Sequence, residues 1–336
     1  MKTELFQSVH NKAEYINFEY TLNWQTLYFG LFLSAIPYQA FTLARMCYIY
    51  CKSKSKATLH LVPFTSLMMM GYSNLFFCIL DNIVFRLPST AIFTSLCASS
   101  DPNKFLIILY ILQLNSTYLS LGSSFLFCVT RCIIHFIPLS YKKVSKIAAW
   151  TLLFGFVIII CFGIYASSFM FGGIGYCRQW DHPFSFGAVY ISYAETDQRH
   201  DPFFVPVTIT LSLFIVLVNI GVICQNKKMA KTTNAGRRVY TDSAGKSLYY
   251  TTLAMIIPYL FHGCLTVITS SLKLFLKIYL QVVSVYYPAT SAYVILIRSA
   301  VTDVFQCSIL ALYNKHTMFQ TKKTSPVAII PLSNLS

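Results

Sequence analysis

Seven long apolar runs dominate this sequence, and a polar or charged segment bounds each of them. A membrane-spanning helix needs about 20 mostly apolar residues to cross roughly 30 Å of hydrocarbon, and each run is long enough. The predicted spans cover residues 25–50, 61–86, 105–131, 147–172, 204–226, 248–272 and 286–313. Only 11% of residues are charged, against roughly 25% in soluble domains. The sequence therefore predicts an all-α membrane protein, a seven-transmembrane helix bundle.

The distribution of basic residues predicts the orientation of this bundle. With the N-terminus outside, seventeen Lys and Arg fall on the inner side, eight (Arg86 among them) fall on the outer side, and Arg298 lies within the last span. Inner loops of membrane proteins carry the excess of Lys and Arg, so we expect the N-terminus outside and the C-terminus in the cytoplasm. The formal net charge is +15, and the basic residues lie in short clusters between the apolar runs. This placement predicts contact with membrane lipid and not with nucleic acid.

The predicted domains follow from the spans. Residues 1–24 form an extracellular N-terminus, 25–313 the seven-transmembrane domain and 314–336 a cytoplasmic tail. The first residues are acidic in part and lack a charged-then-apolar leader, so we expect the first span to act as an uncleaved signal anchor. Six acidic and histidine residues of the second outer loop lack metal-ligand spacing, and we expect them to be solvated: Asp181, His182, Glu195, Asp197, His200 and Asp201.

The cysteines offer an independent prediction. Of the eleven, only Cys97 and Cys177 fall in the predicted outer loops. That side is oxidising, so a disulfide can persist there. We expect a bridge that ties the approach to the third span to the second outer loop; two free thiols are the alternative.

A short motif lies at the predicted inner end of the third span. Arg131 is followed, seven residues on, by Pro138, then by Leu139 and Tyr141. This spacing resembles the Asp-Arg-Tyr and Pro-Leu-x-Tyr motifs of rhodopsin-like G-protein-coupled receptors, although Thr130 stands where that family has Asp. The resemblance implies that these four residues meet a heterotrimeric G protein. The alternative is an arginine that only reaches to the interface and sets orientation.

Three further segments resemble the nematode-type serpentine chemoreceptors. They are the acidic and aromatic stretch Glu14–Tyr20, the stretch Pro183–Tyr193, and the Tyr287-Pro288 start of the last span. The class U group is favoured and the gamma group comes next. The resemblance covers nearly the whole chain. It implies a receptor in the plasma membrane of sensory neurons that detects a small molecule at its outer face and activates a G protein inside.

Charged residues inside the spans point to interior contacts. Asp81, Arg298 and Asp303 each cost about 2.5–3.5 kcal/mol at a helix centre on insertion scales, so they face the bundle interior and find partners. Arg298 lies at a depth similar to that of Asn74. We expect Asn74 or Asp303 to hold Arg298, or Arg298 to face a polar ligand cavity.

Polar and aromatic side chains in the outer halves are the candidates for ligand contact. They are Tyr110, Gln113, His262, Tyr286 and Tyr287, together with Arg298. Plain packing is the alternative for each. No nucleophile–base arrangement or metal-ligand set stands out, so we expect no enzyme activity, no cofactor and no metal. A ligand-gated channel of chemosensory type and a small-molecule transporter are the alternatives to a receptor.

Overall fold

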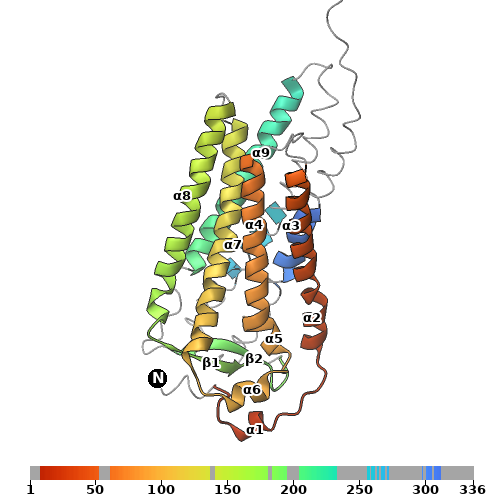
Figure 1. The fold of residues 1–336 in the computed structure, drawn as a ribbon, viewed down its shortest axis with the longest axis vertical. Helices are drawn as coiled ribbons and strands as arrows, with labels where there is room; N and C mark the ends of the chain where they lie inside the picture. Colours follow the sequence, from red (N-terminus) through yellow and green to blue (C-terminus); the bar gives the residue numbers. More distant parts are fainter. Residues whose placement is uncertain are drawn as a thin grey trace, which may run out of the picture.

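The computed structural model describes a large part of the chain. The described residues are 8–52, 61–136, 141–180, 184–194 and 204–232, with further single residues or short stretches between 256 and 271 and between 297 and 311. Within them, five helices are long and apolar enough to cross a membrane. These helices lie side by side and alternate in direction along the chain (Figure 1).

The five spans begin and end close to the predicted positions. They consist of α2 (Trp24–Leu33) with α3 (Ala35–Lys52), α4 (Leu61–Asp81) continued by the π-helix η2 (Asn82–Arg86) and α5 (Leu87–Ser89), α7 (Lys104–Phe136), α8 (Tyr141–Ser167) and α9 (Phe204–Thr232). Apolar helical residues also lie within the predicted sixth and seventh spans, at Tyr259–Ile268 and Ala300–Ala311. The apolar pattern thus located the helices because burial in lipid or core requires it over a full crossing.

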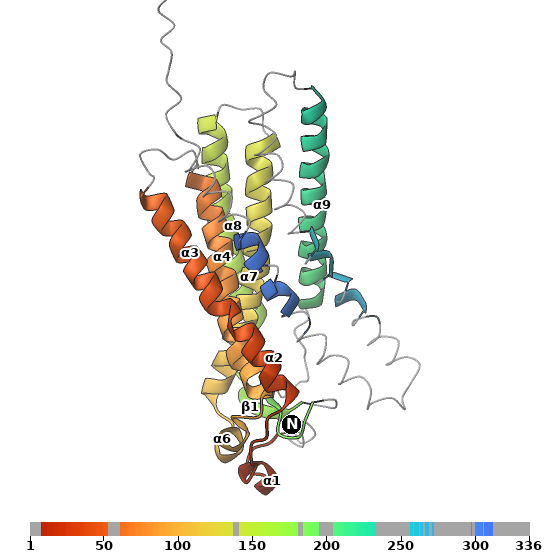
Figure 2. The same cartoon turned by 90° about the vertical axis from the view of Figure 1, so that its right-hand side faces the viewer.

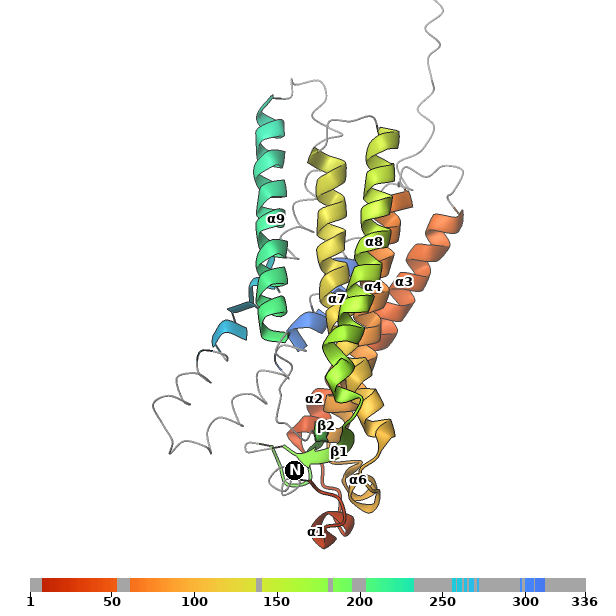
Figure 3. The ribbon, with the colours of Figure 1, turned by 90° about the vertical axis from the view of Figure 1, so that its left-hand side faces the viewer.

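Helix α7 forms the centre of the bundle. It packs against α4, α8 and α9, and two views from opposite sides show it between α9 and the remaining long helices (Figures 2 and 3). The main core joins Leu43, Met70, Phe127, Ile215 and Ile309, each almost fully buried, from five different segments. The outward face of α8 is apolar and exposed instead, as lipid contact requires.

A small two-stranded sheet closes one end of the bundle. Strands β1 (Ile174–Gln179) and β2 (Val189–Ala194) pair antiparallel, with Cys177 opposite Ile191. We call this end, at the bottom of Figure 1, the hairpin end. Strand pairing satisfies the backbone groups of this hairpin, and both of its faces bury apolar side chains. The acidic and histidine residues of the second outer loop that we expect to be solvated lie outside the described residues: Asp181, His182, Glu195, Asp197, His200 and Asp201.

Three short segments complete the cap over the bundle. They are α1 (Ala13–Ile16), α6 (Thr94–Ser99) and the 3-10 turn η3 (Ser168–Met170). Cys97 of α6 and Cys177 of β1 form a disulfide, with their Cα atoms 6.0 Å apart, so the predicted bridge is present. The chain before α1 lies beside β1, and the Val9 N–H donates to the Cys177 carbonyl at 3.1 Å. The predicted N-terminal domain is therefore folded onto the hairpin from residue 8 onward.

Candidate functional site

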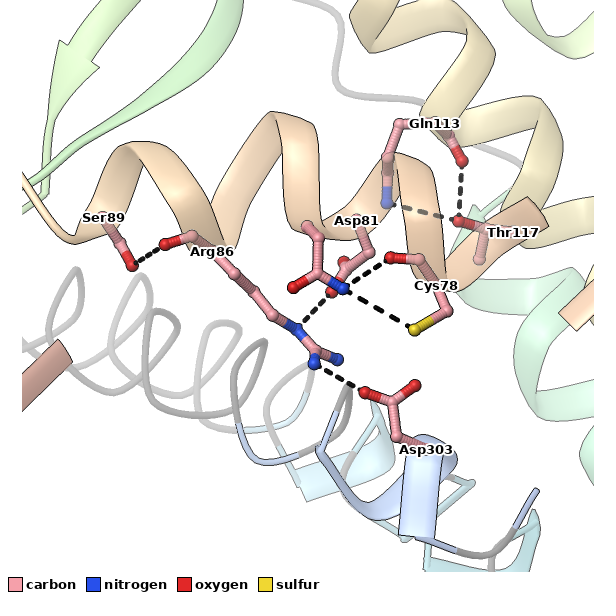
Figure 4. Close-up of polar contacts among 8 residues, drawn as sticks. Cys78, Asp81, Arg86, Ser89, Gln113, Thr117 and Asp303 are labelled. Atoms are coloured by element: carbon pink, nitrogen blue, oxygen red, sulfur yellow. Dashed lines mark hydrogen bonds and ion pairs between the residues drawn. The ribbon is translucent and has the colours of Figure 1, made fainter. Parts of the chain in front are cut away.

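A buried arginine lies where the second span reaches the hairpin end. Arg86 Nε donates to Asp81 Oδ2 at 2.8 Å, and Arg86 Nη1 lies 2.5 Å from Asp303 Oδ2 (Figure 4). The side chains of all three residues are at most 3% exposed. The π-helical turn η2 explains the first contact, because its wider turn places residues five apart on one face. We call Asp81, Arg86 and Asp303 the ion cluster.

Aromatic and polar groups surround the ion cluster. The Phe32 ring of α2 lies with its centroid 5.7 Å from Arg86 Cζ. Asn82 Nδ2 donates to the Cys78 carbonyl at 2.7 Å, and Ser89 Oγ donates to the Arg86 carbonyl at 2.7 Å. A buried guanidinium needs both charge pairing and hydrogen bonds to offset its lost hydration. The ion cluster therefore links the second span to the predicted last span away from water.

The position of Arg86 corrects the sequence-based expectation. The count of basic residues assigns Arg86 to the outer side, yet the residue is fully buried inside the second helical segment. Asp303 contacts Arg86, and the expectation that Asn74 or Asp303 holds Arg298 stays a prediction. Asn74 Oδ1 accepts a short hydrogen bond from Ser120 Oγ of α7. Arg298 itself lies outside the described residues.

Packed aromatic side chains lie between the ion cluster and the hairpin. The Trp180 ring centroid is 4.2 Å from that of Tyr190 and 5.1 Å from that of Phe184, with Phe85 at 6.4 Å. Tyr110 of α7 meets Phe85 edge-on at 6.4 Å. We call these five residues the aromatic cluster. Phe85 immediately precedes Arg86, so the second span contributes to both clusters.

Side-chain hydrogen bonds fix the turn that carries the aromatic cluster. Gln179 Nε2 donates to the carbonyls of Trp180 and Ser185, and Gln179 Oε1 accepts from the Gly187 N–H at 3.1 Å. Thr94 Oγ1 of α6 donates to the Gly187 carbonyl. Gly187 has φ +88°, and a Cβ there would meet the Phe18 ring. These hydrogen bonds therefore hold the described residues on both sides of the turn, from which Trp180 and Phe184 pack together.

A buried histidine fastens the N-terminal chain to the disulfide. His10 Nε2 accepts from the Cys177 N–H at 2.7 Å, so the ring proton is on Nδ1, which donates to the Ser100 carbonyl. Burial lowers the pKa of His10, while the Asp101 carboxylate and the carbonyl contact partly oppose this shift. The neutral ring thus joins three separate segments at the hairpin end.

The predicted ligand residues fall into two groups. Tyr110 lies in the aromatic cluster. Gln113 lies one turn further along α7, where it is buried and donates to Thr117 Oγ1 at 3.5 Å (Figure 4). The remaining candidates lie outside the described residues. They are His262, Tyr286, Tyr287 and Arg298.

The predicted coupling motif belongs to the opposite end of the bundle. Arg131 lies in the last turns of α7, and its Cζ is 5.4 Å from the centroid of the Phe127 ring. Thr130 is fully buried and so faces the bundle interior. Pro138 and Leu139 lie outside the described residues; Tyr141 begins α8, and its side chain is not described. A ring on the same helix therefore supports the arginine where the motif lacks its acidic residue.

Sequence patterns missed three buried residues of the hairpin end. Arg86, His10 and Trp180 each acquire their environment from segments distant in the chain. One signal was present for Arg86: an acidic residue stands five positions earlier inside the same apolar run. That spacing fits a π-turn and not the usual helical neighbours at three and four residues.

An apolar bundle with a disulfide-closed cap at one end and a short arginine motif at the other defines the class of seven-span membrane receptors. Residues 9–322 match the family described as serpentine type 7TM GPCR chemoreceptor Sru, so the chain belongs to that family. This confirms the predicted seven-transmembrane class and the resemblance to the class U group. The family is one of receptors and not of enzymes, and it implies ligand detection and G-protein coupling in general.

A comparison with a known receptor agrees with this finding. The chain is similar to serpentine receptor class U-26 of Caenorhabditis elegans, with 29% identity over 191 residues. The aligned part is 55% of this chain and 63% of that protein, less than two thirds of the relative's length.

Proposed function

We propose that this chain is a chemosensory receptor that binds a small molecule at the hairpin end and activates a heterotrimeric G protein at the opposite end. The observation that carries the proposal is the ion cluster beneath the aromatic cluster. Phe85 packs in the aromatic cluster, while Arg86, the next residue, bonds to Asp303 of a distant helix. A ligand that displaces the aromatic cluster therefore acts on a contact between two spans.

Ligand binding shifts such a bundle only if the ligand prefers one arrangement of the helices. A small molecule that separates Phe85 from Trp180 would move the end of the second span and thereby bias the Arg86–Asp303 contact. The movement reaches the opposite end through α7, which touches α4, α8 and α9. Arg131, with Pro138, Leu139 and Tyr141, then meets the G protein.

The proposed orientation places the hairpin end outside the cell. Lys52, Arg131, Lys143 and Lys146 lie toward the opposite end of their helices, as the excess of basic residues at a cytoplasmic face requires. The disulfide lies at the hairpin end, which suits the oxidising side. We place the receptor in the plasma membrane of sensory neurons. A tag at the C-terminus should be reached by antibody only after permeabilisation; labelling of intact cells would contradict this orientation.

The coupling role is tested by expressing the full chain with a second-messenger reporter and screening a ligand panel. Arg131→Ala should abolish the response to an active ligand while leaving binding and surface level unchanged. Arg45→Ala is a control, because Arg45 is also basic and lies on α3 outside the proposed motif. An equal loss in both variants would favour the orientation-only role of Arg131. A full response in Arg131→Ala would contradict the coupling role.

The two alternative functions, a ligand-gated channel and a transporter, are not favoured. The family match covers most of the chain and describes a receptor.

A further inference from the structure

Two buried hydrogen-bond donors at the hairpin end have no partner in the described part of the chain. They are Arg178 Nε and Trp180 Nε1. Both are donor-only groups, since neither guanidinium nor indole nitrogen accepts a hydrogen bond. A buried donor without a hydrogen-bond partner lowers the free energy of unfolding, and few such donors occur in folded proteins. The presence of two of them therefore needs a physical reason.

The two donors lie on one face of the hairpin. Residues two apart on a strand point to the same side, and the backbone N–H of Trp180 donates to the Ala188 carbonyl at 2.8 Å, so strand pairing continues past the end of β1. Tyr190 stands directly opposite Arg178 in the register and packs on the Trp180 ring at 4.2 Å. The donors are therefore set among the rings of the aromatic cluster.

The surroundings restrict what can satisfy these donors. Trp180 is only 5% exposed, and Phe85, Phe184 and Tyr190 surround it, so a partner must bring a largely apolar body. The partner must also accept two hydrogen bonds, one of them from a cation. A carboxylate has two acceptor oxygens and a negative charge, and charge-assisted hydrogen bonds are stronger than neutral ones.

We propose that Arg178 and Trp180 bind the carboxylate of a small ligand whose apolar body packs against the aromatic cluster. This inference rests on the proposed function and names its ligand class. An organic cation is disfavoured, because its charge would face the Arg178 guanidinium. A hydrocarbon is disfavoured as well, because it would leave both donors without an acceptor.

The test uses the full chain in lipid nanodiscs and binding of tritiated 3-phenylpropanoate. Competing probes share its skeleton: 3-phenylpropanamide, 3-phenylpropylamine and propylbenzene. We expect the carboxylate to compete best, the neutral amide next, and the amine and hydrocarbon at least tenfold more weakly. Absence of carboxylate binding up to millimolar concentration, or equal competition by propylbenzene or the amine, overturns the inference.

Two substitutions locate the binding. Trp180→Phe keeps an aromatic ring and removes the indole N–H, and Arg178→Met keeps an apolar stem and removes the charge. Each should weaken carboxylate binding at least tenfold. Arg178→Met should leave the melting temperature unchanged, because it removes a donor that has no partner in the described part of the chain. Trp180→Phe should lower the melting temperature, because it also removes packed ring volume. Trp150→Phe is the matched control, since Trp150 lies on the exposed face of α8. Unchanged binding in Trp180→Phe and Arg178→Met overturns the inference.

The outcome separates this inference from the function on which it rests. Carboxylate binding that is lost in Trp180→Phe, without any G-protein activation, supports the site and contradicts the proposed signalling. Activation by 3-phenylpropanoate that both variants retain at unchanged potency overturns the site and leaves the signalling proposal in place.

Discussion

Arg86 Nη1 and Asp303 Oδ2 lie 2.5 Å apart. This ion pair joins the second span to the helical residues Ala300–Ala311 of the predicted seventh span. Asp81 Oδ2 holds the same guanidinium at Nε. The two carboxylates therefore fix one arginine from two directions inside the apolar bundle. Since charges in hydrocarbon are tolerated only when paired, the contact specifies how these two spans pack.

Removal of Arg86 should destabilise the receptor more than removal of either single partner. Arg86→Met leaves two buried carboxylates together, and breaking a buried pair costs about 3–5 kcal/mol. We expect a lower melting temperature in detergent and a reduced surface level. Asp303→Asn should cost less, because Asp81 still neutralises the guanidinium.

A double-mutant cycle shows whether the pair acts directly. The combination Arg86→Met with Asp303→Asn should be less damaging than the sum of the single changes, since it removes charges from both sides. Additive losses would show that the 2.5 Å contact does not couple these two residues.

Gly175 should be intolerant of a side chain. Its N–H and C=O bond to Asn103 at 3.2 and 3.0 Å, and a Cβ would press on the backbone of Leu106 and Ile107 at the start of α7. Overpacking of this kind costs about 1–3 kcal/mol, so Gly175→Ala should lower the melting temperature and speed amide exchange in the hairpin. Gly172→Ala is the matched control, because nothing lies within 4 Å of its Cβ position.

Loss of the disulfide should lower the stability of the segments at the hairpin end. The bridge closes a segment with a sequence separation of 80, and removal of a native disulfide costs about 2–5 kcal/mol. Cys97→Ser, Cys177→Ser and the double substitution should have similar melting temperatures, all below that of the parent. Cys161→Ser, at an exposed position on α8, should have no effect. A normal melting temperature in the double variant would contradict a stabilising role of the bridge.

Attachment of the N-terminal chain should depend on pH through His10. Burial places the pKa of the folded His10 below its ordinary value of 6.5, so the unfolded form binds a proton more readily. Attachment is therefore complete above about pH 6.5 and weakens as pH falls from there through the lowered pKa. In the neutral ring, His10 Nε2 accepts from the Cys177 N–H. Protonation adds a hydrogen to Nε2, which then faces the Cys177 N–H and can no longer accept from it.

Amide exchange at two residues measures this attachment: the Cys177 N–H donates to His10, and the Asn11 N–H donates to the Ala98 carbonyl of α6 at 2.8 Å. After correction for intrinsic rates, both amides should lose protection as the pH is lowered. His10→Gln removes the titrating group and should give protection that no longer varies with pH in this range. Equal pH dependence in the parent and in His10→Gln would assign the effect to another group.

The sequence alone determined the spanning architecture of this protein. The apolar runs located the five described spanning helices, and Cys97 and Cys177 were correctly paired, because both features depend on long stretches or on position relative to the membrane. The fold of the second outer loop was not predictable in the same way. Its hairpin depends on Asn103 and Val9, which approach β1 from other parts of the chain.

Only the tertiary structure decided which polar groups meet. Hydropathy marked Asp81 and Asp303 as residues that need partners. The count of basic residues, however, assigned Arg86 to the outer side, and Arg298 was the arginine expected to contact Asp303. The partner of a buried charge is set by how helices pack and by the π-turn at Asn82–Arg86, neither of which has a local sequence period. The donors of Arg178 and Trp180 likewise became visible only when the hairpin was seen folded against the bundle.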